Sequence, residues 1–372
     1  MSADRLINAK RVVIKVGSAL LVDEAHGTVH RKWLESLAAD VARLKARGQD
    51  VILVSSGAIA VGRRYLNLSD GELKLEDKQA AAATGQIRLA HAYQDVLGHH
   101  DMIVAQMLVT LDDTESRRRF LNARNTLNAI LSRGGVPLIN ENDTVATDEI
   151  RFGDNDRLAA RVAAMAGADT LVLLSDIDGL YTADPGKDAN AEHLAEIETI
   201  TSDIEAMAGG SGTQHGSGGM ITKLAAAKIC LQNGCAMAIT LGEGEHPLKR
   251  MEEGARATWF TPSLTPAKAR KCWIAGSLQP TGALVLDDGA LSALKGGKSL
   301  LPIGVTKVEG DFQKGDAVVI KDGAGNELAR GLAAYSSTDA AQIIGKRSSD
   351  IEDILGYRGR DEIVHRDDMA LS

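Results

Sequence analysis

The chain has 372 residues, of which 44% are apolar and only 3% aromatic, and its formal net charge at pH 7 is −8. A chain of this length can bury more than one hydrophobic core, so two soluble domains are expected. The acidic balance argues against a dedicated nucleic-acid-binding protein, whose surface is normally basic. The three cysteines lack paired spacing, which argues against a disulfide framework or zinc ribbon and favours a cytoplasmic setting. No segment approaches the roughly 20 apolar residues of a membrane span, so no membrane association is expected.

Short β-branched segments alternate with helical periods up to about residue 260. Strands are expected at residues 12–14, 51–54, 103–104, 136–139, 171–174 and 236–240. Such alternation predicts an α/β fold with a mostly parallel open sheet sandwiched by helices. Between the first two strands, an apolar stripe over residues 34–44 predicts a helix that stops before Gly48.

The pattern changes after residue 260. Two prolines among small and basic residues predict a linker at 261–275 that follows a catalytic domain at 1–260. Strand candidates at 283–286, 304–308, 317–320 and 328–333 are separated by glycine-rich turns. They predict a small β-rich domain with a C-terminal tail at 276–372.

Lys15 stands near the end of the first expected strand and is followed closely by Gly17. A lysine in a central strand needs an anionic partner, because an unpaired buried ammonium group is costly. The alternative is an edge-strand lysine that reaches water. Gly17 favours a site, since glycine lets the backbone approach a ligand at the carboxyl end of a strand.

The second expected strand is followed by Ser55, Ser56 and Gly57 at a helix start. Free backbone N–H groups and two hydroxyls there suit a carboxylate or phosphate. Simple serine capping of the helix is the alternative. Only the neighbouring motifs favour a ligand at this position.

Carboxylates and amides crowd the segment after the fourth expected strand. They are Glu141, Asp143, Asp148, Glu149, Asp154 and Asp156, with Asn140, Asn142 and Asn155. Because carboxylates at close range repel one another unless cationic or N–H groups lie between them, the segment predicts the polar floor of a site.

A glycine-rich segment at 209–223 ends in Lys223 and leads into a helical pattern. Its N–H groups and ammonium group suit a polyphosphate, although it matches neither the P-loop nor the dinucleotide fingerprint. A surface loop is the alternative. The end of the fifth expected strand, Ser175-Asp176, and the turn-rich loop at 177–185 are weaker candidates for nucleotide contacts.

These groups favour phosphoryl transfer, which needs positioning and charge neutralisation more than covalent help from the protein. An acceptor carboxylate with a pKa near about 4.3 is already ionised at pH 7 and needs no general base. Hydrolysis, hydride transfer and Schiff-base chemistry fit the same groups less well.

Several motifs together resemble the glutamate 5-kinases of the amino acid kinase family. They are residues 15–18 (KVGS), 55–58 (SSGA), 120–124 (FLNAR), 140–143 (NEND), 153–156 (GDND), 179–185 (GLYTADP) and 218–220 (GGM) with Lys223. Residues 280–359 resemble the PUA domain that such bacterial kinases often have at the C-terminus. The resemblance therefore implies an amino acid kinase fold with a PUA-like barrel domain.

The resemblance also implies ATP-dependent phosphorylation of the γ-carboxylate of L-glutamate, the first step of proline biosynthesis, with Mg²⁺ bridging phosphate oxygens. Lys15 and Lys223 would neutralise the transferred group, and Asp156 would hold both lysines. The substrate would be held by Ser56, Gly57, Asp143, Asp154 and Asn155. The nucleotide would contact Lys15, Gly17, Ser175, Asp176, Ser217, Gly218, Gly219, Met220, Ile221, Thr222 and Lys223.

For partners, the resemblance implies feedback inhibition by proline, a homo-oligomer and coupling to the reductase that consumes the acyl phosphate. Two alternatives stay open at this point. One is a related kinase acting on acetylglutamate, aspartate, carbamate or a nucleoside monophosphate. The other is an RNA-binding factor, which the 11 Lys/Arg against 15 Asp/Glu from Gly276 onward disfavour.

Overall fold

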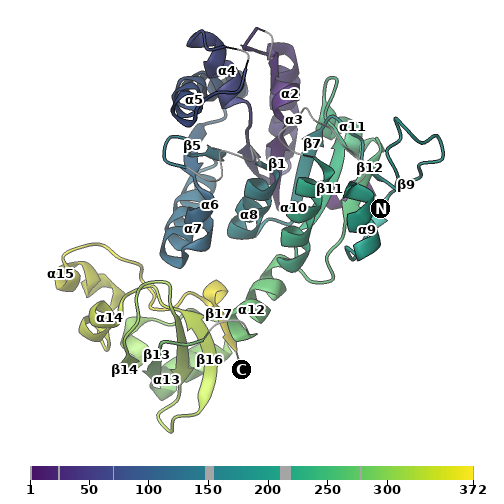
Figure 1. The fold of residues 1–372 in the computed structure, drawn as a ribbon. Coiled ribbons are helices and arrows are strands. Elements are labelled where there is room, and N and C mark those ends of the chain that lie inside the picture. The colour runs from purple at the N-terminus through teal and green to yellow at the C-terminus, as the bar shows by residue number, and fades with distance from the viewer. Residues whose placement is uncertain are drawn as a thin grey trace. The chain divides into compact units, whose positions relative to one another are not determined.

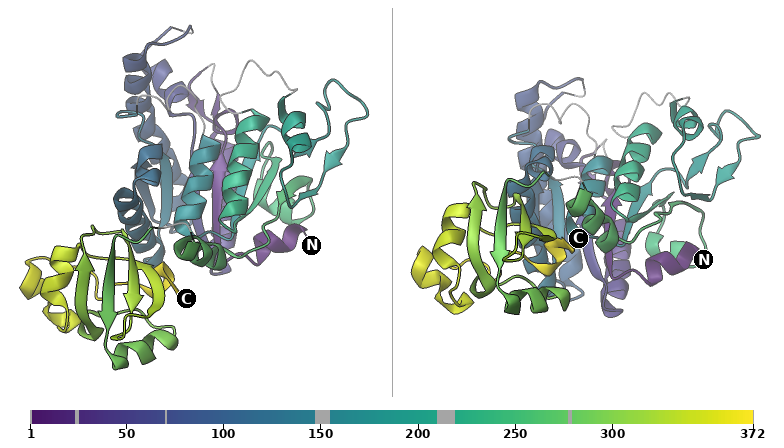
Figure 2. Two further views of the ribbon diagram at one scale, coloured as in Figure 1. Left: turned by 60° about the horizontal axis from the view of Figure 1, so that its bottom comes forward. Right: turned by 90° about the horizontal axis from the view of Figure 1, so that it is seen from below.

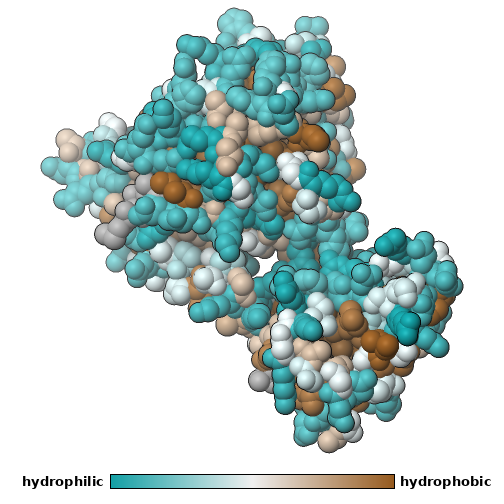
Figure 3. All heavy atoms as spheres, turned by 180° about the vertical axis from the view of Figure 1, so that it is seen from behind, coloured by the Kyte–Doolittle hydropathy of each residue, from teal (hydrophilic) through white to brown (hydrophobic). Residues whose placement is uncertain are grey.

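A computed structural model describes residues 2–23, 26–69, 71–146, 155–209, 219–276 and 279–371. The chain forms two compact units, residues 1–266 and 267–372. Among the described helices, none is both long and apolar enough to cross a bilayer. Figure 3 shows a mostly hydrophilic surface on the viewed face of both units, as the net charge of −8 leads one to expect.

Unit 1 is built on an eight-stranded sheet with the order β10-β12-β11-β7-β1-β4-β6-β5. Its strands are β1 (Arg11–Val16), β4 (Asp50–Val54), β5 (Val104–Val109), β6 (Val136–Glu141), β7 (Thr170–Ser175), β10 (Glu196–Ile197), β11 (Ala236–Leu241) and β12 (Ala257–Phe260). All neighbours are parallel except β11 and β12. The predicted mostly parallel sheet is confirmed, and β1, with Lys15, lies inside it.

Helices cover both faces of this sheet (Figures 1 and 2). One core contains Val12 and Ile14 of β1 and side chains of α3 (Arg31–Ala46), α4 (Ala58–Tyr65), α5 (Leu75–Gly98) and α11 (Pro247–Glu252). The opposite core contains Val13 and side chains of α7 (Arg117–Ser132), α8 (Asn155–Ala166) and α10 (Met220–Gln232). Alternate residues of β1 thus enter opposite cores, which is why residues 12–14 are all apolar.

Shorter elements complete unit 1. They are α1 (Ser2–Ile7), α2 (Ser18–Leu21), α6 (Leu111–Glu115), α9 (Ser202–Gly209) and the strand pairs β2 (Val22–Asp23) with β3 (Thr28–Val29) and β8 (Leu180–Tyr181) with β9 (His193–Leu194). The predicted end of α3 is as expected, because Arg47 is its C-cap and Gly48 follows with φ +81°.

Unit 2 has its own sheet, in the order β14-β13-β15-β16-β17, and a separate core. Its strands are β13 (Gly282–Leu286), β14 (Val305–Gly310), β15 (Ala317–Lys321), β16 (Glu327–Leu332) and β17 (Met369–Leu371). The helices are α12 (Pro266–Gly276), α13 (Asp288–Lys295), α14 (Ser337–Ile343) and α15 (Ile351–Leu355), with short 3₁₀ turns η2 (Pro302–Gly304), η3 (Ser348–Asp350) and η4 (Arg366–Asp368). The prediction of a β-rich second domain is confirmed.

The expected linker at 261–275 contains most of helix α12. Pro266 fits the first position of a helix, and the alanines, lysines and arginines after it favour helix formation. Arg270 of α12 donates to Asp368 at 2.6 Å, so the helix belongs structurally to unit 2.

Candidate active site

Five parallel strands bring their carboxyl ends to one edge of the sheet. At this edge lie Lys15 of β1, Ser55 after β4, Glu141 of β6, Ser175 of β7 and Leu241 of β11. Helices α8 and α10 begin at the same edge, because Asp156 in the first turn of α8 contacts both Lys15 at the end of β1 and Lys223 in the first turn of α10. The topology therefore collects motifs that are far apart in the sequence.

Asp156 is the centre of the candidate site. It lies in the first turn of α8 and is only 1% exposed. Its Oδ1 lies 2.8 Å from Nζ of Lys15, and its Oδ2 accepts a hydrogen bond of 3.1 Å from Nζ of Lys223. The structure thus brings the three residues together, although β1, α8 and α10 supply one each.

The electrostatics of the trio follow from this geometry. Burial raises the pKa of Asp156, but the positive charges of Lys15 and Lys223 outweigh it and lower the pKa to about 2. The carboxylate is therefore ionised at neutral pH, and two ammonium groups share its single charge. Two ammonium groups around one carboxylate make this a suitable place for an anionic ligand.

Thr222 joins the trio from the first turn of α10. Its Oγ1 lies 3.2 Å from Oδ2 of Asp156 and donates to the carbonyl of Gly219 at 2.8 Å. The helix start is thereby tied to α8. Met220 and Ile221 occupy the same turn, and the Ile221 side chain is 64% exposed.

Asn155 connects the acidic segment with the serine motif. Its Nδ2 donates to the carbonyl of Ser55 at 2.7 Å, to Oγ of Ser56 at 3.1 Å and to Oδ1 of Asn140 at 2.9 Å. Gly57 adopts φ +93°, and a Cβ there would lie 2.9 Å from Cγ2 of Val22. The serine turn is therefore held in place from two sides.

The pKa of Asp143 is shifted in the opposite direction from that of Asp156. Burial raises its pKa to about 6, and a hydrogen bond with Gln86 offsets part of that increase. Gln86 of α5 is itself buried and donates to the carbonyl of Glu141 at 3.3 Å. Sequence reasoning missed Gln86, because a single glutamine in an alanine-rich helix has no distinctive pattern.

The remaining predicted residues divide into two groups. Ser175 donates through Oγ to Oδ1 of Asp176 at 2.9 Å, and Gly17 lies beside the carbonyl of Leu174. Asp154, Ser217 and Gly218 lie outside the described residues, as do Asp148 and Glu149 of the acidic segment. Outside the site, Arg119 of α7 pairs with Asp112 and Asp113 on the surface.

Comparison with known proteins places this geometry in a family. Residues 10–240 match the family model "Amino acid kinase family", and residues 282–355 match "PUA domain". Two solved structures match 68% of this chain, each with a TM-score of 0.47. A structure of isopentenyl phosphate kinase is 15% identical and is matched over 100% of its own chain. A structure of UMP kinase from Ureaplasma parvum is 16% identical and is matched over 98% of its own chain.

Curated relatives are much more similar. Glutamate 5-kinase of Paramagnetospirillum magneticum is 63% identical over 98% of this chain and 99% of its own. That of Rhodospirillum rubrum is 58% identical over 96% of this chain and 96% of its own. That of Rhizobium etli is 58% identical over 99% of this chain and 94% of its own. The chain therefore belongs to the amino acid kinase family, as a member of its glutamate 5-kinase group.

Proposed function

We propose that the protein transfers the γ-phosphoryl group of ATP to the γ-carboxylate of L-glutamate, giving L-glutamyl 5-phosphate for proline biosynthesis. The observation that supports this most directly is the pair of lysines held by Asp156 at the carboxyl edge of a parallel sheet. The identity of 63% to a glutamate 5-kinase over nearly the whole chain supports the choice of substrate.

Lys15 and Lys223 are proposed to neutralise the phosphoryl group as it moves from ATP to glutamate. Electrostatic stabilisation of this kind is usually the largest contribution in phosphoryl transfer. Asp156 holds both ammonium groups in advance, so they need not reorganise during the reaction. No general base is required, because the acceptor carboxylate is ionised at neutral pH.

Glutamate is proposed to bind beside Ser56, Gly57, Asp143, Asp154 and Asn155. The Nδ2 of Asn155 and the turn at Gly57 fix the Ser56 hydroxyl, which suits a substrate carboxylate. Asp143 supplies a negative charge for the α-ammonium group of the amino acid. An N-acetylated substrate has no such ammonium group and is expected to bind poorly.

ATP is proposed to contact Gly17, Ser175, Asp176 and residues 217–223, which include Gly218, Gly219 and Thr222. Mg²⁺ would enter with ATP, neutralising phosphate charge and keeping several waters. Both oxygens of Asp156 already contact lysine ammonium groups. That pairing fits an ion held mainly by phosphate oxygens and water.

The direct test is an assay of the purified protein with ATP, Mg²⁺ and hydroxylamine. Glutamate should yield γ-glutamyl hydroxamate, whereas N-acetylglutamate, aspartate and UMP should yield little or no phosphorylated product. Product formation without glutamate, or a preference for one of the other acceptors, would overturn the assignment. The same assay with increasing proline tests the proposed feedback inhibition, which a flat response would remove.

Self-association is a further proposal. Cooperation with a reductase is another, and the acyl phosphate product supports it. An acyl phosphate hydrolyses readily, so rapid consumption by a second enzyme protects the product. ATP as co-substrate favours a cytoplasmic location. Light scattering would give the oligomeric state, and coupled assays with the reductase would test for transfer of the product between the enzymes.

A further inference from the structure

The segment 242–248 begins at the same edge of the sheet as the candidate site. Gly242 follows β11, and its N–H donates to the carbonyl of Ser175 at 2.7 Å. A Cβ on Gly242 would lie 2.3 Å from Cδ1 of Leu20, in the helix after Gly17. Gly242 is therefore packed against Leu20 of α2 and Leu174 of β7, and a larger residue there would require the Leu20 side chain to move.

Helix α3 holds both ends of this segment. Trp33 donates from Nε1 to the carbonyl of Gly242 at 2.8 Å in a buried position. At the other end Asp40, 1% exposed, accepts hydrogen bonds from the N–H groups of Leu248 at 2.8 Å and Lys249 at 3.2 Å. Asp40 thus caps helix α11 from a different element.

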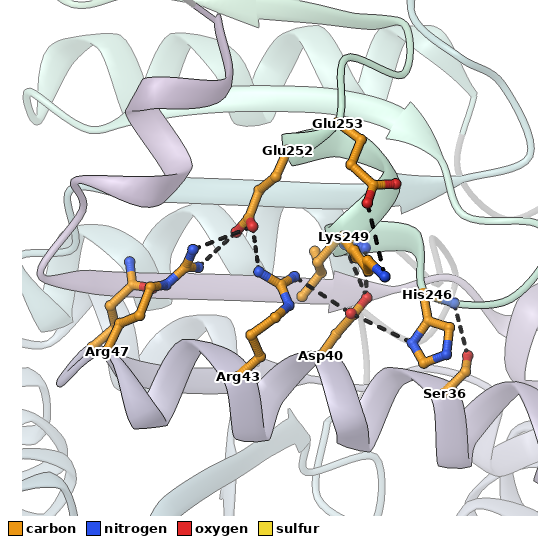
Figure 4. A network of polar contacts seen from close by, with 10 residues as sticks. Ser36, Asp40, Arg43, Arg47, His246, Lys249, Glu252 and Glu253 are labelled. Atoms are coloured by element: carbon orange, nitrogen blue, oxygen red, sulfur yellow. Dashed lines mark hydrogen bonds and ion pairs between the residues drawn. The ribbon is translucent and has the colours of Figure 1, made fainter.

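His246 explains why the cap comes from outside α11. It is the N-cap residue, has φ 54° and makes no capping hydrogen bond with its own side chain. Its N–H donates to Oγ of Ser36 at 3.1 Å (Figure 4). Trp33, Ser36 and Asp40 are three and four residues apart, so they lie on one face of α3.

The same face continues away from the site with a second group of contacts between α3 and α11. Arg43 and Arg47 both contact the carboxylate of Glu252 at the end of α11, and the Arg47 contact measures 2.6 Å (Figure 4). This ion-pair cluster joins the same two helices and touches neither Gly242 nor Ser175. Its one contact with Asp40 is through Arg43, whose guanidinium lies 3.4 Å from Oδ1 of Asp40, and Glu252→Gln leaves that contact in place. The cluster offers a matched control for effects of stability alone.

We propose that Trp33 and Asp40 are positioning residues for the nucleotide. They fix the two ends of segment 242–248. Gly242 in turn holds the end of β7 through its hydrogen bond to the carbonyl of Ser175. The inference rests on the proposed function, in which Ser175 and Asp176 contact ATP. Displacement of a binding group by about 1 Å can change a rate or affinity by as much as about 100-fold, so a fixed strand end matters.

The test compares Trp33→Phe, Asp40→Ala and Asp40→Asn with the control Glu252→Gln. Trp33→Phe keeps a ring but removes the N–H donor, and Asp40→Asn keeps an oxygen that can accept from Leu248. Trp33→Phe and Asp40→Ala should raise the KM for ATP about fivefold to tenfold, as expected for a lost buried hydrogen bond. The KM for glutamate and kcat should change less than twofold.

Asp40→Asn should restore the KM for ATP to within about twofold of the native value. Glu252→Gln should lower the melting temperature while leaving both KM values unchanged, because its contacts are remote from Gly242. The proposal is wrong if Glu252→Gln raises the KM for ATP as much as Trp33→Phe does. It is equally wrong if the α3 variants raise both KM values together.

Calorimetric titration with ATP alone separates this inference from the proposed function. A native protein that binds ATP but does not phosphorylate glutamate would refute the proposed substrate, yet weaker ATP binding by Trp33→Phe would still support the positioning role. If the native protein phosphorylates glutamate and the ATP affinity is unchanged in Trp33→Phe and Asp40→Ala, the positioning role alone is refuted.

Discussion

Lys223 tests the proposed chemistry at the scale of a single residue. The residue is only 6% exposed, and its ammonium group contacts the same Asp156 carboxylate as Lys15, at the place proposed for the transferred phosphoryl group. We expect Lys223→Ala to lower kcat by about 1,000-fold, because the lysine acts mainly on the transition state. A change confined to KM would contradict that role.

Lys228 offers the matched control for this measurement. It belongs to the same helix, α10, but is exposed and pairs with Glu205 on the surface. Lys228→Ala should therefore leave both kcat and KM within about twofold, since surface ion pairs contribute little. Steady-state kinetics of the two variants would separate loss of a specific ammonium group from general loss of charge.

Asp143 predicts a pH dependence. Burial raises its pKa to about 6, so protonation in mild acid removes the charge proposed to bind the substrate ammonium group. The kcat/KM for glutamate should fall tenfold per pH unit below about pH 6. In Asp143→Asn this decline should disappear from the profile, which would run at a uniformly lower level.

The same pKa shift predicts the direction of a stability change. A carboxyl group with a raised pKa in the folded protein binds its proton more tightly when folded, so folding stability falls as pH rises from about 4 to 6. Above pH 6, Asp143→Asn should be more stable than the native protein by about 1–2 kcal/mol. Urea unfolding at pH 4 and pH 8 would check this, and an equal gain at both values would contradict it.

A functional residue can be predicted from the sequence when its local context is unusual. It cannot be predicted when its role depends only on partners that are distant in the chain. Lys15 and Asp156 are visible because a charged residue at the end of an apolar strand, or in a dense acidic segment, needs an explanation. Asp40 has an ordinary place in an amphipathic helix. Its partners Leu248 and Lys249 are 208 and 209 residues away, so only the fold reveals its role.

At the scale of elements, six of the eight strands of the sheet were predicted, because β-branched apolar segments mark buried parallel strands. The short strands β10 and β12 at one end of the sheet were not predicted. The close pair of α4 and α5 was not predicted either. A Cβ on Gly62 would lie 1.7 Å from the carbonyl oxygen of Ala81, and one on Gly85 would lie 1.8 Å from that of Ala58. The backbones of α4 and α5 are in contact at these glycines, and no periodicity in the sequence indicates such a contact.

Gly85→Ala is therefore expected to destabilise the protein by about 3 kcal/mol or more, because a methyl group would push the helices apart. Gly98→Ala, in the last position of the same helix, is the control, since a Cβ there has no atom within 4 Å. It should be neutral or slightly stabilising, given the better helix propensity of alanine. Thermal melts of both variants would show whether close packing, rather than glycine itself, is what the position requires.

At the scale of the whole molecule, the second unit (residues 267–372) has 14 Lys/Arg against 15 Asp/Glu and therefore has no basic excess. Phosphate backbones are bound through lysine and arginine, and such binding weakens with added salt. We expect no salt-sensitive gel shift of tRNA at micromolar protein. A shift that disappears between low and physiological salt would restore the nucleic-acid alternative.

The separate cores of the two units predict that the first unit works alone. All the described residues of the candidate site lie before residue 267, and the third core contains only residues of unit 2. The cut between the two units belongs after Pro266, because α12 packs on unit 2: Arg270 pairs with Asp368, and Arg330 donates to the carbonyl of Ala275.

A fragment of residues 1–266 should fold and keep kcat and both KM values within about threefold of the full chain. A fragment ending at Lys271 would retain the first half of α12 without its partners and should be less soluble, since an isolated short helix is unstable in water. Activity and melting curves of the two fragments decide the point. If the shorter fragment folds but loses activity or proline sensitivity, the second unit has a part in catalysis or regulation that its separate core does not reveal.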